Sequence, residues 1–245
     1  MTPPDDGDPE LPEDRTSVIV SPVDQSLPAR TDPRAAVEPP EWRRPRLYEW
    51  YFSSTPYGHA MRTREEGVVF AALDPLLHEE QRVLELGSGT GHYTLRLARH
   101  VREVVGLDAS PAMVEYLEGR LRREGVTNVV AERGVIPRPY EGSDGFDGVV
   151  AVGVLNYVAH LGEALRWIRE RVRPGGFAVF TVPTAGPTGQ VSRLTARLSR
   201  KAVYPVASGE VRRALTGAGL ELRHAAGAGL GGRDRTLVVH AAVPA

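Results

Sequence analysis

The residues best placed to do chemistry form a glycine-rich turn after an apolar run. Residues 83–86 read as a short β-strand, and Gly-Ser-Gly-Thr-Gly follows at 87–91, directly before a helical pattern. Glycines at such a junction let the backbone turn tightly and let a ligand approach main-chain N–H groups at a helix N-terminus. The sequence therefore predicts a ligand site at this strand-to-helix turn.

The spacing of these glycines argues against several other nucleotide and acyl sites. A dinucleotide-binding loop, Gly-x-Gly-x-x-Gly, would place its third glycine where His92 stands. No Gly-Lys-Ser/Thr follows, as a phosphate-binding P-loop requires, and Leu86 breaks the Gly-x-Ser-x-Gly turn of a hydrolase around Ser88. Phosphate and acyl chemistry are therefore disfavoured.

Asp108 ends the next predicted strand, twenty-one residues after Gly87. A carboxylate at the end of the second strand of a doubly wound sheet can accept hydrogen bonds from both hydroxyls of a ribose. The alternative role for Asp108 is to cap the helix that begins near Pro111, although Ser110 fits that cap better. We therefore expect an adenosine compound without a pyrophosphate as the ligand.

Short β-branched runs alternate with amphipathic stretches through the rest of the chain. Strands are expected at 82–86, 103–107, 128–131, 148–152 and 176–182, and helices at 93–99, 111–124 and 161–171. This alternation predicts an α/β fold with a doubly wound parallel sheet and helices on both faces. The runs at 220–224 and 236–242, joined by a glycine-rich connection, predict a closing hairpin.

Composition separates the chain into a tail and a domain. Residues 1–46 hold 10 of the 20 prolines, with ten acidic and six basic residues, and predict a disordered tail rich in proline and acid. Residues 47–245 predict one domain. The overall charge of −1 gives no global attraction to nucleic acid or to an anionic membrane surface, and the absence of cysteine excludes disulfides, thiolate zinc sites and a cysteine nucleophile.

Two weaker features concern the source and location of the protein. The N-terminus carries early acidic residues in place of a basic region and an apolar run, so we expect a cytoplasmic protein. Arginine outnumbers lysine 29 to 1, which indicates a GC-rich bacterial source by association.

Several segments together resemble the class I S-adenosylmethionine-dependent methyltransferases, over about residues 47–243. The matching segments are VLELGSGTG at 83–91, VVGLDASPAM at 104–113, FDGVVAVGVLNYV at 146–158, LRWIRERVRPGGFAVF at 165–180 and ALTGAGLEL at 214–222. The resemblance implies an enzyme with a Rossmann-like seven-stranded sheet whose last strand is antiparallel. It also implies S-adenosyl-L-methionine as the cofactor.

The same resemblance implies where the cofactor lies. Glu85 and the 87–91 loop would hold the methionine moiety, Asp108 the ribose, and Met113 one face of the adenine, unless Met113 is only a core residue of its helix. The family usually has Asp after the glycine that follows the third strand, whereas Val135 follows here, so main-chain groups near Val135 are expected to contact adenine. The full predicted set is Glu85, Gly87, Ser88, Gly89, Gly91, Asp108, Ala109, Met113, Val135, Gly153 and Tyr48.

Methyl transfer from a sulfonium needs alignment and desolvation more than it needs protein nucleophiles. The sequence leaves open whether a general base exists. The candidates are His160, Tyr157 and His59, with His92 and His224 also considered; for each histidine the alternative is a surface or locally hydrogen-bonded residue.

The acceptor is expected to be a small molecule. The Asn-Pro-Pro-Tyr-like motif of amino-group methyltransferases that act on DNA or protein is missing beside Asn156. Residues 185–235 hold nine basic and three acidic residues but Tyr204 as their only aromatic, which favours a solvated helix face over an RNA-binding surface. The aromatic segment 48–52 either closes over an apolar acceptor as a lid or packs on the domain. No nucleic-acid or membrane partner is expected.

Two alternative functions were weighed. One is a cofactor-binding module of the same fold that lacks catalysis and acts as a partner or regulator. The other is a nicotinamide-dependent oxidoreductase, which the glycine spacing and the absence of a Tyr-x-x-x-Lys pair argue against, since Lys201 is the chain's only lysine.

Overall fold

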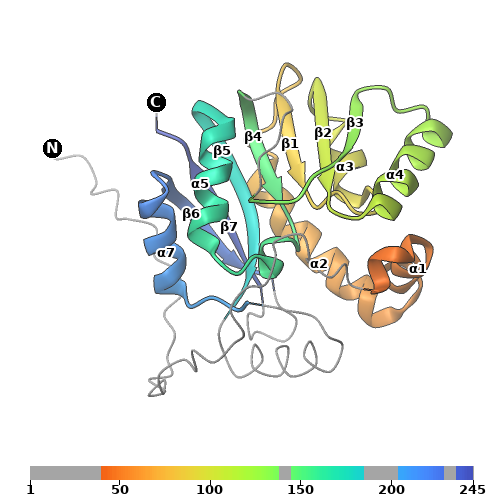
Figure 1. The fold of residues 1–245 in the computed structure, drawn as a ribbon, viewed down its shortest axis with the longest axis horizontal. Helices are drawn as coiled ribbons and strands as arrows, with labels where there is room; N and C mark the ends of the chain where they lie inside the picture. The colour runs from red at the N-terminus through yellow and green to blue at the C-terminus, as the bar shows by residue number, and fades with distance from the viewer. Residues whose placement is uncertain (1–39, 138–144, 185–203, 229–235, 245) are drawn as a thin grey trace, which may run out of the picture.

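A computed structural model describes residues 40–137, 145–184, 204–228 and 236–244 of the chain. Its centre is a seven-stranded sheet with the strand order β3-β2-β1-β4-β5-β7-β6 (Figure 1). The strands are β1 (Arg82–Leu86), β2 (Glu103–Asp108), β3 (Val129–Arg133), β4 (Phe146–Ala151), β5 (Val172–Pro183), β6 (Glu221–Gly227) and β7 (Thr236–Ala242). The predicted tail over residues 1–39 and the basic segment at 185–203 lie outside the described residues.

Strand direction follows the predicted fold. β1 to β5 pair in parallel, while β7 runs antiparallel to both of its neighbours, β5 and β6. The predicted Rossmann-like sheet with an antiparallel last strand is confirmed. β5 begins at Val172, four residues before the expected start, because pairing of Phe146 with Val172 extends the strand around an irregularity.

Helices cover both faces of the sheet. The helices are η2 (Pro40–Arg43), α1 (Pro45–Ser54), α2 (Pro56–Leu73), α3 (His92–Leu97), α4 (Pro111–Glu124), η3 (Leu155–Tyr157), α5 (Leu161–Arg171) and α7 (Ser208–Gly217). One core cluster joins α5 and α7 to the sheet, and a second joins α2 and α3 to alternate residues of the same strands. This two-sided burial explains why the central strands are almost wholly apolar.

Local signals fix the ends of the helices that lead to the site. Ser110 caps α4, accepting from the Met113 amide at 3.4 Å, and Gly125 ends the helix with φ of 67°. Thr55 caps α2 by accepting from the Gly58 amide at 3.1 Å. Among the helices of the described residues, none combines the length and apolar character that a membrane crossing requires.

The predicted tail ends too late. Residues 40–46 were expected to be disordered, but they form η2 and the start of α1. The reason is a tertiary contact: the Ser110 hydroxyl donates to the Trp42 carbonyl at 3.1 Å. η2 is therefore held by α4, which follows much later in the chain.

Candidate active site

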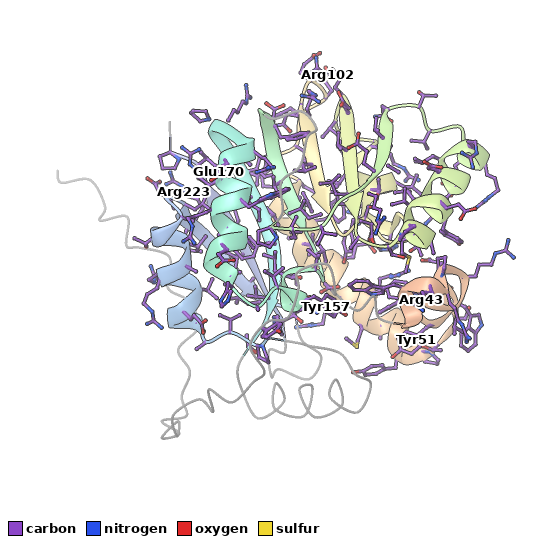
Figure 2. All side chains as sticks on the ribbon, in the orientation of Figure 1. Arg43, Tyr51, Arg102, Tyr157, Glu170 and Arg223 are labelled. Carbon is purple, nitrogen blue, oxygen red and sulfur yellow. The ribbon has the colours of Figure 1, made fainter. Side chains whose placement is uncertain are left out.

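A cavity of about 230 Å³ lies at the carboxyl ends of the parallel strands, beside the switch in strand order between β1 and β4. Its walls come from the segments after β1, β2, β3 and β4 and from η2, α1 and α2. Figure 2 shows Tyr157 at this edge of the sheet and Tyr51 on α1. This is where ligands bind in open α/β sheets.

The loop at 87–91 joins β1 to α3 and borders the cavity. Gly87, Gly89 and Gly91 have φ of 71°, 53° and 85°, a backbone region that residues with a Cβ rarely adopt. A Cβ on Gly87 would lie 2.9 Å from Val154, whereas a Cβ on Gly89 would meet only a carbonyl oxygen 3.8 Å away. Gly89 therefore leaves room for a ligand to reach the backbone.

Asp108 lies at the end of β2 with its carboxylate fixed from two sides. Oδ2 accepts from the Gly89 amide and Oδ1 from the Ser110 amide, both at 2.8 Å. The cap of α4 is Ser110, so the alternative role of Asp108 as that cap is wrong. Asp108 lines the cavity, where a carboxylate can accept hydrogen bonds from ligand hydroxyls.

The side of the cavity expected to hold adenine is mostly apolar. Ala109, Met113, Val135 and Ile136 line it. Met113 is 2% exposed, so this side chain belongs to the core of α4 and also borders the cavity. Glu132, a residue of β3, is absent from the cavity wall formed by the described residues.

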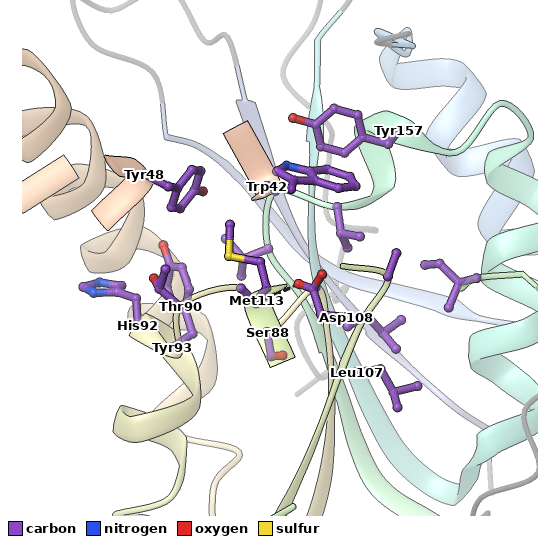
Figure 3. A pocket seen from close by; sticks show the side chains of 18 of the residues that line it. Trp42, Tyr48, Ser88, Thr90, His92, Tyr93, Leu107, Asp108, Met113 and Tyr157 are labelled. Carbon is purple, nitrogen blue, oxygen red and sulfur yellow. Dashed lines mark hydrogen bonds between the residues drawn. The ribbon is translucent and has the colours of Figure 1, made fainter. Parts of the chain in front are cut away.

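Aromatic side chains close the other walls. Trp42 packs edge-on against Tyr157, with ring centroids 5.0 Å apart and planes at 87°, and both line the cavity (Figure 3). Tyr48 also lines it and packs on Phe52 with ring centroids 4.9 Å apart. Burial raises the pKa of Tyr48 and of Tyr157, so both phenols stay protonated at neutral pH.

A cluster of three polar side chains, Glu49, Arg62 and Thr90, connects α1 and α2 to the loop at 87–91. The Thr90 hydroxyl donates to Glu49 Oε2 at 2.6 Å, and Arg62 donates to Glu49 Oε1 at 3.0 Å. Burial alone would raise the pKa of Glu49, but these two partners outweigh it and lower the pKa. Glu49 is therefore an ionised bridge between the loop and α2.

His92, the first residue of α3, also lines the cavity. Its Nε2 lies 3.2 Å from Glu66 Oε2, and Arg96 donates to the other oxygen of Glu66 at 2.6 Å. Burial and the charge of Arg62 lower the pKa of His92, against the opposing effect of Glu66. The imidazole is therefore neutral at pH 7.

The structure brings most of the predicted cofactor residues to this cavity. Those that line it are Tyr48, Gly87, Ser88, Gly89, Asp108, Ala109, Met113, Val135 and Gly153. Gly91 and Glu85 do not line it; Gly91 caps α3, and Glu85 is 2% exposed, with Oε2 lacking a hydrogen-bond partner among the described residues. Glu85 is thus buried behind the loop, and its predicted contact with methionine gains no support.

The predicted general bases divide in the same way. Tyr157 lines the cavity, whereas His59 and His160 do not. Among the histidines that the structure describes, His92 is the one in the cavity wall. Only the tertiary structure shows which of these histidines lies at the cavity, because no local sequence pattern distinguishes one histidine from another.

Sequence reasoning missed several residues of the wall, among them Trp42, Arg62 and Glu65. Trp42 falls within the bounds of the predicted tail, residues 1–46. Arg62 and Glu65 stand three positions apart, so they share one face of a helix, and this spacing was the available signal.

Comparison with known families identifies the domain. A family model described as a methyltransferase domain matches residues 57–225, more than half of the 245 residues. The chain belongs to this methyltransferase family. The methyltransferase is 33% identical over 117 residues to an uncharacterized methyltransferase of Emericella nidulans, a match that covers 41% of each protein. The match thus spans about two fifths of that relative's length.

Solved structures show the same fold. An S-adenosylmethionine-dependent methyltransferase from Mesorhizobium loti superposes with a TM-score of 0.62 at 19% identity, covering 73% of this chain and 97% of that one. The N-methyltransferase NodS from Bradyrhizobium japonicum, in complex with S-adenosylhomocysteine, superposes with a TM-score of 0.61 at 20% identity, covering 80% and 92%. The predicted methyltransferase family is confirmed by the family match, and the predicted fold is confirmed by the solved structures, whereas S-adenosylmethionine remains the predicted cofactor.

The cavity of the methyltransferase fits this cofactor. Gly89 leaves the backbone open to a ligand, Asp108 offers acceptor capacity for hydroxyls, and the apolar wall around Met113 suits a purine ring. Ala109, Met113, Val135 and Ile136, which form that wall, have uncharged side chains. The individual roles of these residues are part of the proposal below.

Proposed function

We propose that the methyltransferase acts on a small, mainly apolar acceptor that enters beside Trp42 and Tyr157. The observation that carries this proposal is the edge-on contact of these two rings at the cavity wall, with centroids 5.0 Å apart. Val154 and Val158 continue the same wall with apolar side chains. A narrow cavity with aromatic and aliphatic walls suits a small molecule better than a polymer.

When bound, S-adenosylmethionine supplies a methyl group already activated on a sulfonium. The protein then has to position the acceptor and exclude water. Trp42, Tyr48 and Tyr157 perform both tasks, since their rings cover the cavity between η2, α1 and η3. The neutral imidazole of His92 is a proton acceptor at the wall for acceptors that lose a proton.

The cofactor roles proposed from the resemblance can be tested at Asp108. Its replacement in Asp108→Ala should weaken binding of S-adenosylhomocysteine by about 2 kcal/mol, because hydrogen bonds to a carboxylate are lost. Isothermal titration calorimetry measures the affinity, and thermal unfolding checks that the variant folds. Unchanged affinity in a folded variant would remove Asp108 from the ribose site.

The acceptor class is tested with methyl-labelled S-adenosylmethionine and two sets of acceptors. The first set pools phenols, quinols and aliphatic amines, and the second contains ribosomal RNA, transfer RNA and unfolded protein. Label should enter the small-molecule fraction, and this transfer should fall at least tenfold in Tyr157→Ala. Label only in RNA or protein would contradict the proposal, and tight binding without transfer to any acceptor would favour a non-catalytic module.

A further inference from the structure

Two oppositely charged side chains of α2 reach the cavity together. Arg62 and Glu65 both line it, and their spacing of three residues places them on one face of the helix. The hydrogen bonds and ion pairs between described residues include none between Arg62 and Glu65. The two side chains therefore do not neutralise each other through a direct ion pair.

Arg62 is fixed in place but uses few of its donors. Its side chain is 12% exposed, NH1 donates to Glu49 Oε1 at 3.0 Å, and its guanidinium carbon lies 4.5 Å from the centre of the Phe52 ring. Among the described residues, Nε and NH2 have no hydrogen-bond acceptor. A guanidinium held in this way, with free N–H groups beside a cavity, suits a carboxylate.

Glu65 is the negatively charged partner in the cavity wall, and it too has few hydrogen-bond partners. The Tyr93 hydroxyl donates to Oε2 at 3.4 Å, while Oε1 has no hydrogen-bond partner among the described residues. Burial raises the pKa of this carboxyl, and the Tyr93 hydrogen bond and the charge of Arg62 only partly oppose it. A desolvated carboxylate is costly without a cation, so an ammonium group of a ligand would stabilise it.

The location of the pair relates to the orientation of the cofactor. Figure 3 shows Thr90, His92 and Tyr93 on one side of Ser88 and Met113, with Asp108 on the other. Glu65 bonds to Tyr93, so the pair lies on the side away from Asp108. If the ribose lies at Asp108, the amino-acid end of the cofactor extends past the loop toward α2.

We propose that Arg62 binds the carboxylate and Glu65 the ammonium group of the amino-acid end of S-adenosylmethionine. The pair makes the site selective for adenosyl thioethers that carry an intact amino acid. It replaces the buried Glu85 as the protein's contact with that end. The proposal rests on the cofactor and is independent of the acceptor.

The test measures binding of three probes to the full chain by calorimetry. S-adenosylhomocysteine carries the whole amino acid, its decarboxylated analogue lacks the carboxylate, and its deaminated analogue lacks the ammonium group. In Arg62→Met, affinity for S-adenosylhomocysteine should fall about 10- to 100-fold, while affinity for the decarboxylated analogue changes less than about threefold. In Glu65→Gln, affinity for S-adenosylhomocysteine should likewise fall about 10- to 100-fold, while affinity for the deaminated analogue changes less than about threefold.

Controls separate recognition from folding. Arg64→Met, an exposed change on the same helix, should leave all three affinities unchanged. Arg62→Lys keeps the charge and should bind S-adenosylhomocysteine more tightly than Arg62→Met does. The proposal is overturned if the variants weaken all three probes equally or leave binding of S-adenosylhomocysteine intact. Absence of methyl transfer to small molecules would contradict only the proposed acceptor, because these titrations contain no acceptor.

Discussion

The hydroxyl of Ser110 donates a hydrogen bond to the main-chain carbonyl of Trp42, 3.1 Å away, although 68 positions separate the two residues. Ser110 also caps α4 and lies next to the turn that follows Asp108. One serine thus connects the start of α4, the end of β2 and the aromatic wall of the cavity. The contact explains why residues 40–46 form η2 and the start of α1, before the expected domain boundary.

Two truncations test this contact. Deleting residues 1–39 should leave binding of S-adenosylhomocysteine unchanged, because the proline-rich acidic composition of that stretch offers little apolar surface to bury. Deleting residues 1–46 also removes Trp42 and should weaken binding about tenfold, since a cavity wall is lost. Calorimetry measures both affinities. Equal affinities in the two truncated proteins would show that Trp42 is dispensable.

Gly89 and Gly125 provide a matched pair for the glycine-rich loop. Both have positive φ, 53° and 67°, and a Cβ would fit sterically at either position in the protein alone. Gly89→Ala and Gly125→Ala should each lower the free energy of unfolding by about 1 kcal/mol through backbone strain. Only Gly89→Ala should lose cofactor affinity, because its new methyl group lies at the cavity wall. Equal affinities in titrations of both variants would place the cofactor elsewhere.

Substitutions at Tyr48 and Trp50 test whether the aromatic segment 48–52 acts as a lid over the acceptor or only packs on the domain. Tyr48 lines the cavity, whereas Trp50 is 55% exposed on α1. Tyr48→Ala should therefore reduce kcat/KM at least tenfold, while Trp50→Ala should change neither kcat/KM nor the melting temperature appreciably. Steady-state kinetics with an accepted substrate and thermal unfolding measure these effects. A melting temperature lowered in Tyr48→Ala with normal kinetics would make the segment structural only.

Glu85 should give the fold a distinctive dependence on pH. Burial chiefly, with a contribution from the charge of Asp108, raises the pKa of Glu85 from 4.5 to about 8. Between these values the folded protein retains a proton that the unfolded chain releases. The free energy of unfolding contributed by this group therefore falls as pH rises through that window.

The variant Glu85→Gln isolates this effect, because the amide cannot ionise. Urea unfolding at about pH 5 and about pH 8 should show that the stability of the variant relative to the original protein increases with pH. Other titrating groups cancel in the comparison. A stability difference that is the same at both pH values would mean that Glu85 ionises normally in the folded protein.

Much of the fold was determined locally, and the sequence predicted those parts well. β1 and α4 have the predicted bounds, because each is specified by its own residues: the apolar run of β1, and Ser110 and Gly125 at the two ends of α4. The glycine loop and Asp108 were found for the same reason, since the loop directly follows β1 and Asp108 ends β2.

The composition of the cavity wall was decided by tertiary structure. Trp42 reaches the cavity because η2 is held by Ser110 at the start of α4, and Arg62 and Glu65 reach it because α2 packs on the sheet. No pattern near these residues specifies that packing. The same holds for Glu85, for which the family resemblance implied a ligand contact. The side-chain period of a strand turns successive residues to opposite faces, and only the packed sheet decided that Glu85 would be buried away from the cavity.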